Sequence, residues 1–305
     1  GGGSIRIPAS CCGLVGLKPS RARNPLGPAL GDVMSGLVVE HIVSRTVRDS
    51  AAMLDVTAGP APGDPYYAPP GPKSWLAASR KKTGKLRIGF AATKPDGNSY
   101  DAECLAAVGH AVNLCKDLGH KVEPASPAVD MEQIVGCFMT LWTGGLAMQV
   151  DMLTAQTGKR PSTRTLEGLT LGLYEAGKQV TASQYLAAVA AVQALSRQVA
   201  AWHDRYDVWM TPTLGKLPMP LGSFDTGERN PLKGFAPMID YAPFTAIQNA
   251  TGQPAISLPL YIGEAGLPVG VQFIGPVGGE PLLLQLATAL EKADPWGKRH
   301  PAVWG

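Results

Sequence analysis

The chain lacks the patterns that define a disulfide scaffold, a zinc site or a membrane span. Its five cysteines are an odd number, with no Cys-x-x-Cys pair and no histidines at zinc-finger spacing, which argues against a disulfide or metal framework. No apolar run approaches the ~18–20 residues of a membrane-spanning helix. With 27 Lys and Arg against 24 Asp and Glu, the net charge is only +3 and is dispersed. The sequence therefore indicates no nucleic-acid partner and no membrane surface.

Glycine and proline are abundant instead. The 305 residues include 36 Gly and 27 Pro, well above the roughly 12% that these two residues make up in average proteins. This composition favours many loops between buried elements and argues against an all-helical bundle. The length allows either two domains of about 150 residues or one large α/β domain.

Several segments carry secondary-structure signals. Residues 47–58 are predicted to be helical, and the strand pattern of 86–90 precedes a helix that Asp101 would cap and Gly119 would end. Residues 121–123 have the pattern of the next strand. This strand, helix, strand order predicts a parallel crossover.

The second half of the chain predicts a long helix and an antiparallel pair of strands. Thr181 and Gln184 have the spacing of a capping box, at the start of a helix that runs to about Trp202. Strands are predicted at 207–210, 255–262 and 269–274, the last two joined by a turn at 263–266, and a final helix at 281–292. Together these signals indicate an α/β fold with a mixed sheet.

Two consecutive stretches are interpreted as surface. Residues 59–72 contain six prolines, which predict an extended linker or a wrapping loop that separates two segments without proving two domains. The basic run that follows is interpreted as a solvated surface and not as a phosphate-binding site. It consists of Arg80, Lys81, Lys82, Lys85 and Arg87.

The first four residues are Gly1, Gly2, Gly3 and Ser4. They carry no basic start or apolar core of a signal peptide. Consecutive glycines leave the backbone bare, so that successive N–H groups can turn toward one point and form a nest for negative charge. A serine beside such a nest is well placed to attack a carbonyl whose oxygen becomes an oxyanion. The alternative is a flexible linker with an ordinary serine.

The residues that follow Ser4 favour the anion-binding nest over the flexible linker. Residues 1–9 read Gly-Gly-Gly-Ser-Ile-Arg-Ile-Pro-Ala, and 16–19 read Gly-Leu-Lys-Pro. They resemble the end of the amidase signature, Asp-x-Gly-x-Ser-hydrophobic-Arg-x-Pro-small, and the block that follows it in that family. Residues 44–49, 206–213, 249–255 and 266–272 resemble later family blocks, so the likeness covers the whole chain. Residues 10–20 and 36–41 look most like the bacterial amidases that include 6-aminohexanoate-cyclic-dimer hydrolase.

The resemblance implies a mixed β-sheet flanked by helices on both faces, and hydrolysis of linear or cyclic amides through a Ser–cis-Ser–Lys triad with an acyl-enzyme intermediate. Ser4 matches the nucleophile. The backbone amides of Gly1, Gly2 and Gly3, with that of Ser4, match the oxyanion hole.

The family's Lys base, its cis-Ser and the leading Asp lie upstream of this motif. We therefore expect residues 1–305 to be the C-terminal portion of a single amidase domain, with the N-terminal part absent. A serine hydroxyl is a weak nucleophile without an adjacent base, so we expect the chain to be inactive alone.

Other catalytic constellations are weaker. Arg6 stands where an α/β-hydrolase elbow, Gly-x-Ser-x-Gly, needs its second glycine. Residues 79–82 fit Ser-x-x-Lys but lie in the basic run. The histidines lack metal-ligand spacing and are interpreted as structural or surface groups, although a histidine triad assembled in space stays open; they are His41, His110, His120, His203 and His300.

The remaining candidates are cysteines and an apolar stripe. We interpret Cys11 and Cys12 as packed behind the serine loop, and Cys104 and Cys115 as buried hydrophobes typical of a reducing cytosol. The stripe is assigned to the core and not to a pocket, and it comprises Met139, Trp142 and Met148. Three polar residues near a glycine turn would orient an amide or simply form the turn: Asn249, Thr251 and Gln253.

These observations predict an enzyme that acts on a small-molecule amide in the cytoplasm, without cofactor, metal, nucleic acid or membrane, and with a homodimer admissible. Two alternatives are kept. One is an amidotransferase A subunit, which would need a B-subunit partner. The other is a truncated, non-catalytic interaction module.

Overall fold

A mixed sheet runs through the centre of the computed structural model, which describes residues 1–301 and 303. Within these residues the strand order is β2-β1-β6-β7-β5-β3-β4. β3 is parallel to β4 and β5, and the other neighbouring pairs are antiparallel. The strands are β1 (Val15–Lys18), β2 (Val43–Ser44), β3 (Arg87–Phe90), β4 (Lys121–Pro124), β5 (Val208–Pro212), β6 (Ala255–Ile262) and β7 (Pro268–Ile274).

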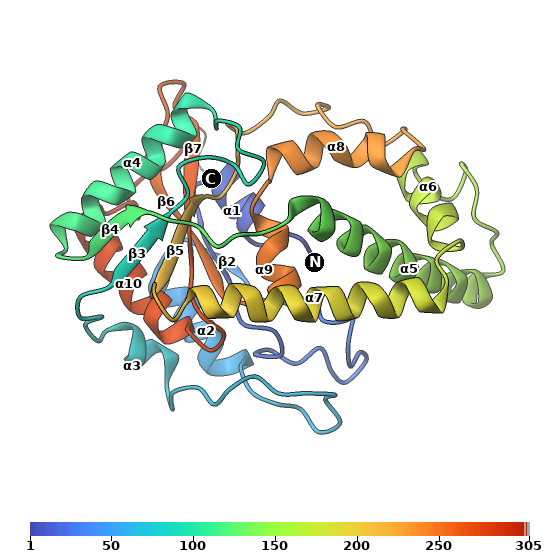
Figure 1. The fold of residues 1–305 in the computed structure, drawn as a ribbon, viewed down its shortest axis with the longest axis horizontal. Helices are drawn as coiled ribbons and strands as arrows, with labels where there is room; N and C mark the ends of the chain where they lie inside the picture. Colours follow the sequence, from blue (N-terminus) through green and yellow to red (C-terminus); the bar gives the residue numbers. More distant parts are fainter. Residues whose placement is uncertain (302, 304–305) are drawn as a thin grey trace.

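Helices cover both faces of this sheet (Figure 1). One face carries α2 (Val47–Thr57), α3 (Trp75–Ser79), α4 (Ala102–Asp117) and α10 (Glu280–Ala293). The other carries α1 (Arg6–Cys11) and α9 (Thr245–Thr251), from which α5 (Met131–Thr157), α6 (Gly168–Gly177), α7 (Ala182–Trp202) and α8 (Pro231–Tyr241) extend outward. The predicted fold class is therefore confirmed. In the described part of the chain no helix is both long and apolar enough to cross a membrane.

The structure confirms the elements that had the clearest sequence patterns. The Gln184 amide donates to the Thr181 hydroxyl at 3.2 Å, and the Thr181 amide donates to the Gln184 side chain at 2.9 Å, which completes the capping box of α7. The crossover from β3 through α4 to β4 is parallel, and β6 and β7 form the predicted antiparallel pair. Asp101 lies at the N-cap of α4, although its side chain makes no capping hydrogen bond.

Five helices were not predicted from the sequence, namely α1, α3, α6, α8 and α9. α1 is six residues long and contains Pro8 in its first turn, where a missing N–H has no cost because those amides lack helical acceptors. α9 ends at Gly252, whose φ of +79° stops the helix in the left-handed region.

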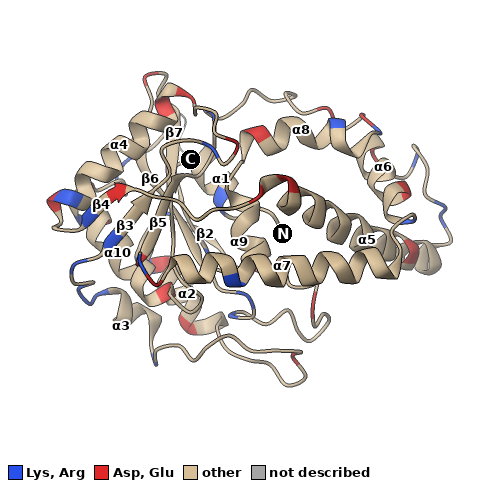
Figure 2. Cartoon of the chain, in the orientation of Figure 1, with Lys and Arg blue, Asp and Glu red and all other residues tan. Residues whose placement is uncertain are grey.

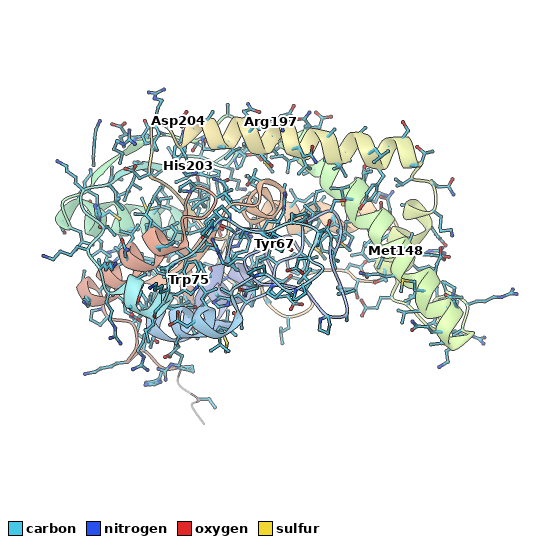
Figure 3. The ribbon with its side chains drawn as sticks, turned by 90° about the horizontal axis from the view of Figure 1, so that it is seen from below. Tyr67, Trp75, Met148, Arg197, His203 and Asp204 are labelled. Atoms are coloured by element: carbon cyan, nitrogen blue, oxygen red, sulfur yellow. The ribbon has the colours of Figure 1, made fainter. Side chains whose placement is uncertain are left out.

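The proline-rich loop at 59–72 joins α2 to α3, and β1 before it and β3 after it belong to the same sheet. The buried Arg23 guanidinium holds the loop through a bond to the Pro69 carbonyl at 2.7 Å, and it lies 4.8 Å from the ring centre of Trp75 on α3. Figure 3 labels Trp75, and Tyr67 in the loop. Arg23 also pairs at 2.9 Å with Glu280, which is fully buried.

We expect Glu280→Gln to lower the free energy of unfolding by about 3–5 kcal/mol, because it leaves the Arg23 charge buried without its partner. Urea unfolding followed by tryptophan fluorescence measures this loss. Glu175→Gln is the matched control, since Glu175 pairs at 2.6 Å with Arg229 on the surface and such pairs contribute about 0–1 kcal/mol. Equal small losses in both variants would contradict the assignment.

Candidate active site

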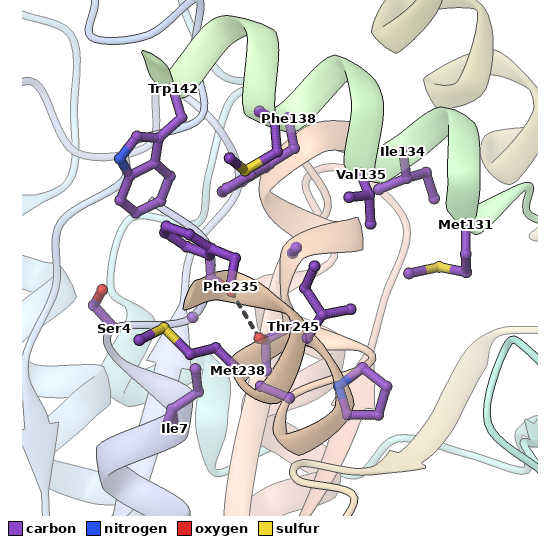
Figure 4. A pocket seen from close by; sticks show the side chains of 17 residues that line it. Ser4, Ile7, Met131, Ile134, Val135, Phe138, Trp142, Phe235, Met238 and Thr245 are labelled. Atoms are coloured by element: carbon purple, nitrogen blue, oxygen red, sulfur yellow. Dashed lines mark hydrogen bonds between the residues drawn. The ribbon is translucent and has the colours of Figure 1, made fainter. Parts of the chain in front are cut away.

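Ser4 precedes α1, and its exposed side chain lines a cavity of about 190 Å³ (Figure 4). The cavity lies between the glycine turn at residues 2–3, the first half of α5, the end of α8 and the start of α9. Of the described side chains that line it, only those of Ser4 and Thr245 carry hydroxyl groups. The remaining walls are almost entirely apolar.

Aromatic rings form one end of this cavity. The ring centres of Phe138 and Trp142 on α5 are 5.1 Å apart, and Phe235 from α8 meets Trp142 edge-on at 5.9 Å. Met139 and Trp142 were expected in the core, and that expectation was wrong, because both line the cavity. Met148, farther along α5 (Figure 3), is 57% exposed. A helix face opposite a cavity has the same apolar spacing as one opposite the core, so the sequence did not separate the two.

The glycine turn has a backbone that other residues rarely adopt. Gly2 has a φ of +124° and Gly3 a φ of +150°. A Cβ on Gly3 would lie 2.5 Å from Thr245 Oγ1 and 2.6 Å from Ile7 Cδ1, so a larger residue does not fit without displacing both. The Thr245 hydroxyl donates to the Gly2 carbonyl at 2.7 Å. Because the Gly2–Gly3 peptide is trans, the Gly3 N–H points away from Thr245.

The amides of this turn are free. The Gly3 carbonyl accepts the first hydrogen bond of α1, from Ile7 N–H at 2.8 Å. Within residues 1–301 and 303, the N–H groups of Gly2, Gly3 and Ser4 donate to no protein atom. Gly1 lies against Leu37. Successive unpaired amides beside a hydroxyl are the donors that a developing oxyanion requires.

Arg6 anchors this arrangement from behind. Its side chain is fully buried, and its terminal nitrogens donate to four neutral acceptors. These are Gln248 Oε1 at 2.8 Å, Gln272 Oε1 at 2.6 Å, the Thr245 carbonyl at 2.7 Å and Asn249 Oδ1 at 2.6 Å. Burial lowers the pKa of Arg6 to about 9. The guanidinium therefore fixes α1 against α9 and β7 without a carboxylate counter-ion.

The three polar residues near Gly252 form hydrogen bonds within the protein; they are Asn249, Thr251 and Gln253. Asn249 Nδ2 donates to the Leu37 carbonyl at 2.7 Å, and Thr251 donates to Gln253 at 2.9 Å. Gln253 Nε2 lies 2.7 Å from His203 Nε2. None of the three lines the cavity. The structure thus favours the packing interpretation over substrate contact.

No base accompanies Ser4 in the described part of the chain. The Ser4 hydroxyl has no hydrogen-bond partner there, and no lysine or histidine lines the cavity. His110 pairs with Asp294 at 2.9 Å, and His203 contacts the carbonyl of Tyr206 at 3.1 Å. The rival Ser79 is buried in α3. Among residues 1–301 and 303, His, Cys, Asp and Glu form no group of three that could hold a metal ion.

Four of the five cysteines form two groups with different surroundings, and the fifth, Cys137 on α5, is half-buried. Cys104 and Cys115 are fully buried as predicted, and burial raises the pKa of each thiol to about 12. Cys11 is half-buried, with its sulfur 3.2 Å from the hydroxyl of Tyr241 at the end of α8. Cys12 is exposed, so its expected place in a packed wall was wrong, because the helix ends there and turns it outward.

Fold and site together define the protein class. A mixed α/β sandwich presents a serine after a glycine turn, beside an apolar cavity, and the amidase family profile matches residues 1–284. The chain therefore belongs to the amidase signature family, as its sequence motifs predicted.

Relatives of known name support this assignment. The chain is 33% identical over 311 residues to 6-aminohexanoate-cyclic-dimer hydrolase of Pseudomonas sp. (strain NK87), covering 99% of this chain and 63% of that protein. It is 34% identical over 302 residues to the putative amidase AmiC of Mycobacterium leprae, covering 98% and 62%. A solved structure of 6-aminohexanoate cyclic dimer hydrolase superposes with a TM-score of 0.90 at 32% identity, covering 98% and 64%. The chain thus spans less than two thirds of the length of these relatives.

We expect Gly3→Ala to lower the free energy of unfolding by about 1–3 kcal/mol, because the new Cβ has no space and the φ is strained. Gly109→Ala is the control. Gly109 lies in α4 with open space around it, so alanine there should raise stability by up to about 1 kcal/mol. Urea unfolding of both variants checks the sign of each change, and a neutral Gly3→Ala would refute the steric account.

Proposed function

We propose that Ser4 is the nucleophile of an amide hydrolase. The observation that carries this proposal is the set of free amides at Gly2, Gly3 and Ser4 next to an exposed hydroxyl, in a chain of the amidase signature family. The amide of Gly1 completes the oxyanion hole by resemblance. Membership of the family supports amide hydrolysis, and the glycine turn supports the assignment to this serine.

The chemistry follows from these groups. Ser4 Oγ attacks the carbonyl carbon of the amide, and the carbonyl oxygen takes the negative charge while accepting hydrogen bonds from the turn. A base removes the Ser4 proton and passes it to the leaving nitrogen as the C–N bond breaks. The resulting ester is then hydrolysed by water, which releases the carboxylic acid and restores the Ser4 hydroxyl.

The base is the missing component. We propose that it is the family's lysine, relayed by a cis-serine, in the part of the longer relatives that this chain does not span. Losing triad members leaves only binding and the oxyanion hole, which retain a small fraction of the rate. Residues 1–305 alone are therefore proposed to be nearly inactive.

The walls of the cavity suggest the substrate class. Among the residues that the structure describes, no charged side chain lines it, and apolar side chains from α5 and α8 form most of its surface. We propose a linear or cyclic amide whose acyl chain is aliphatic and uncharged beside the scissile bond. The relative named for 6-aminohexanoate cyclic dimer offers a first substrate to assay.

In the protein that carries the proposed base, we expect Ser4→Ala to lower kcat for amide hydrolysis by about 10⁴–10⁶. Ser196→Ala, on α7, should leave kcat unchanged, because Ser196 only bonds the Val192 carbonyl. Amine release from 6-aminohexanoate cyclic dimer and from linear amides measures both. Activity that survives Ser4→Ala would exclude this nucleophile, whereas ordinary turnover by residues 1–305 alone would exclude the upstream base.

We expect Trp142→Ala to raise KM for long aliphatic amides by about tenfold or more, because the aromatic end of the cavity is lost. KM for a short amide such as acetamide should change little. Met148→Ala is the matched control, since Met148 is on the same helix but faces solvent. A loss of the same size for short and long substrates would contradict binding at this wall.

A further inference from the structure

A second hollow, of about 380 Å³, lies on the sheet face opposite Ser4. It is formed by the segment after α3, the turn after α4 and one side of α10. Figure 2 shows basic residues along the segment that leads from α3 to β3. Its lining residues include four cations, Arg80, Lys81, Lys82 and Lys292.

These charges are uncompensated. Among the described residues, no acidic side chain lines the hollow. In the same residues Arg80, Lys81, Lys82 and Lys292 form no ion pair or side-chain hydrogen bond. Four cations converging on one concave surface raise the local concentration of anions.

Among the described residues, His120 adds a buried, unpartnered ring nitrogen to the lining of this hollow. His120 lines the hollow, and the residue is only 7% exposed. Its Nδ1 accepts a hydrogen bond from the Leu86 amide at 3.2 Å. Burial lowers the pKa of His120, which favours the neutral ring. Since Nδ1 is the acceptor, the proton is on Nε2. That Nε2 is buried and has no partner in the described part of the chain, an arrangement that folded proteins rarely tolerate.

The other two residues of the basic run, Lys85 and Arg87, do not line this hollow. Arg87 pairs with Asp207 at 3.1 Å. All five residues of the basic run are exposed, as the sequence predicted, and the first three also line one hollow. Such convergence distinguishes a binding surface from scattered surface charge.

We propose that this hollow binds a small molecule that bears a phosphate group. A phosphate carries more than one negative charge and only acceptor oxygens, which matches an arginine fork, lysine ammonium groups and one neutral N–H donor. The volume is within the range of roughly 300–1,000 Å³ that holds small ligands, so the phosphate is part of a larger molecule. The site is independent of Ser4 and of the proposed hydrolase activity.

The test uses inorganic phosphate and inorganic pyrophosphate as probes, titrated calorimetrically into the protein at low ionic strength, where screening is weak. We expect saturable binding, and a shift of the His120 Nε2 nitrogen resonance on addition of either probe. The double variant Lys82→Ala/Lys292→Ala should bind about 100-fold more weakly, at about tenfold for each cation removed. Unchanged thermal unfolding of the variant without phosphate shows that it has folded.

Lys73→Ala/Lys85→Ala is the control, because it removes the same net charge from exposed positions outside the hollow. It should bind within about twofold of the parent protein. Equal weakening in both double variants would mean diffuse attraction and overturn the site. Absence of binding, or binding that leaves the His120 resonance unmoved, would overturn it as well.

Discussion

The burial of one cation, Arg6, is the constraint on which the candidate site depends. Its guanidinium has lost all contact with water and is held by four neutral oxygen acceptors from α9 and β7. Removing an acceptor would leave a charged donor unsatisfied in the interior, which is among the more costly changes a protein can undergo. Since Arg6 lies two positions after Ser4, this network fixes where the serine stands relative to the sheet.

Thr245 links this polar frame to the reacting side of the site. Its carbonyl accepts from Arg6, and its hydroxyl holds the Gly2 carbonyl, so one residue sets the orientation of both α1 and the glycine turn. On the other side of Thr245 begins the apolar wall of the cavity. Here a buried polar network lies behind free amides and an apolar surface lies in front of them, and backbone donors act more strongly on a developing charge in surroundings of low polarity.

The sheet separates two regions of different character. On the side of α1, α5, α8 and α9, charge is excluded from the cavity and the walls are apolar. On the side of α3, α4 and α10, cations gather around a hollow, and the buried pair of Arg23 and Glu280 secures the proline-rich loop. The two proposed ligands, an uncharged amide and an anion, would therefore bind on opposite faces of the same sheet.

The sequence by itself determined the family, the mixed α/β fold and the position of Ser4, because each is written in contiguous letters: the glycine turn, the capping box of α7 and the hairpin between β6 and β7. Tertiary structure decided the rest. The acceptors of Arg6 lie at least 239 positions away along the chain, and Lys82 and Lys292 line one hollow because α10 packs beside α3. Met139 and Trp142 have the spacing of core residues, and only the placement of α8 opposite α5 made them walls of a cavity. Local patterns record what a segment prefers, whereas contacts between distant segments exist only once the chain has folded.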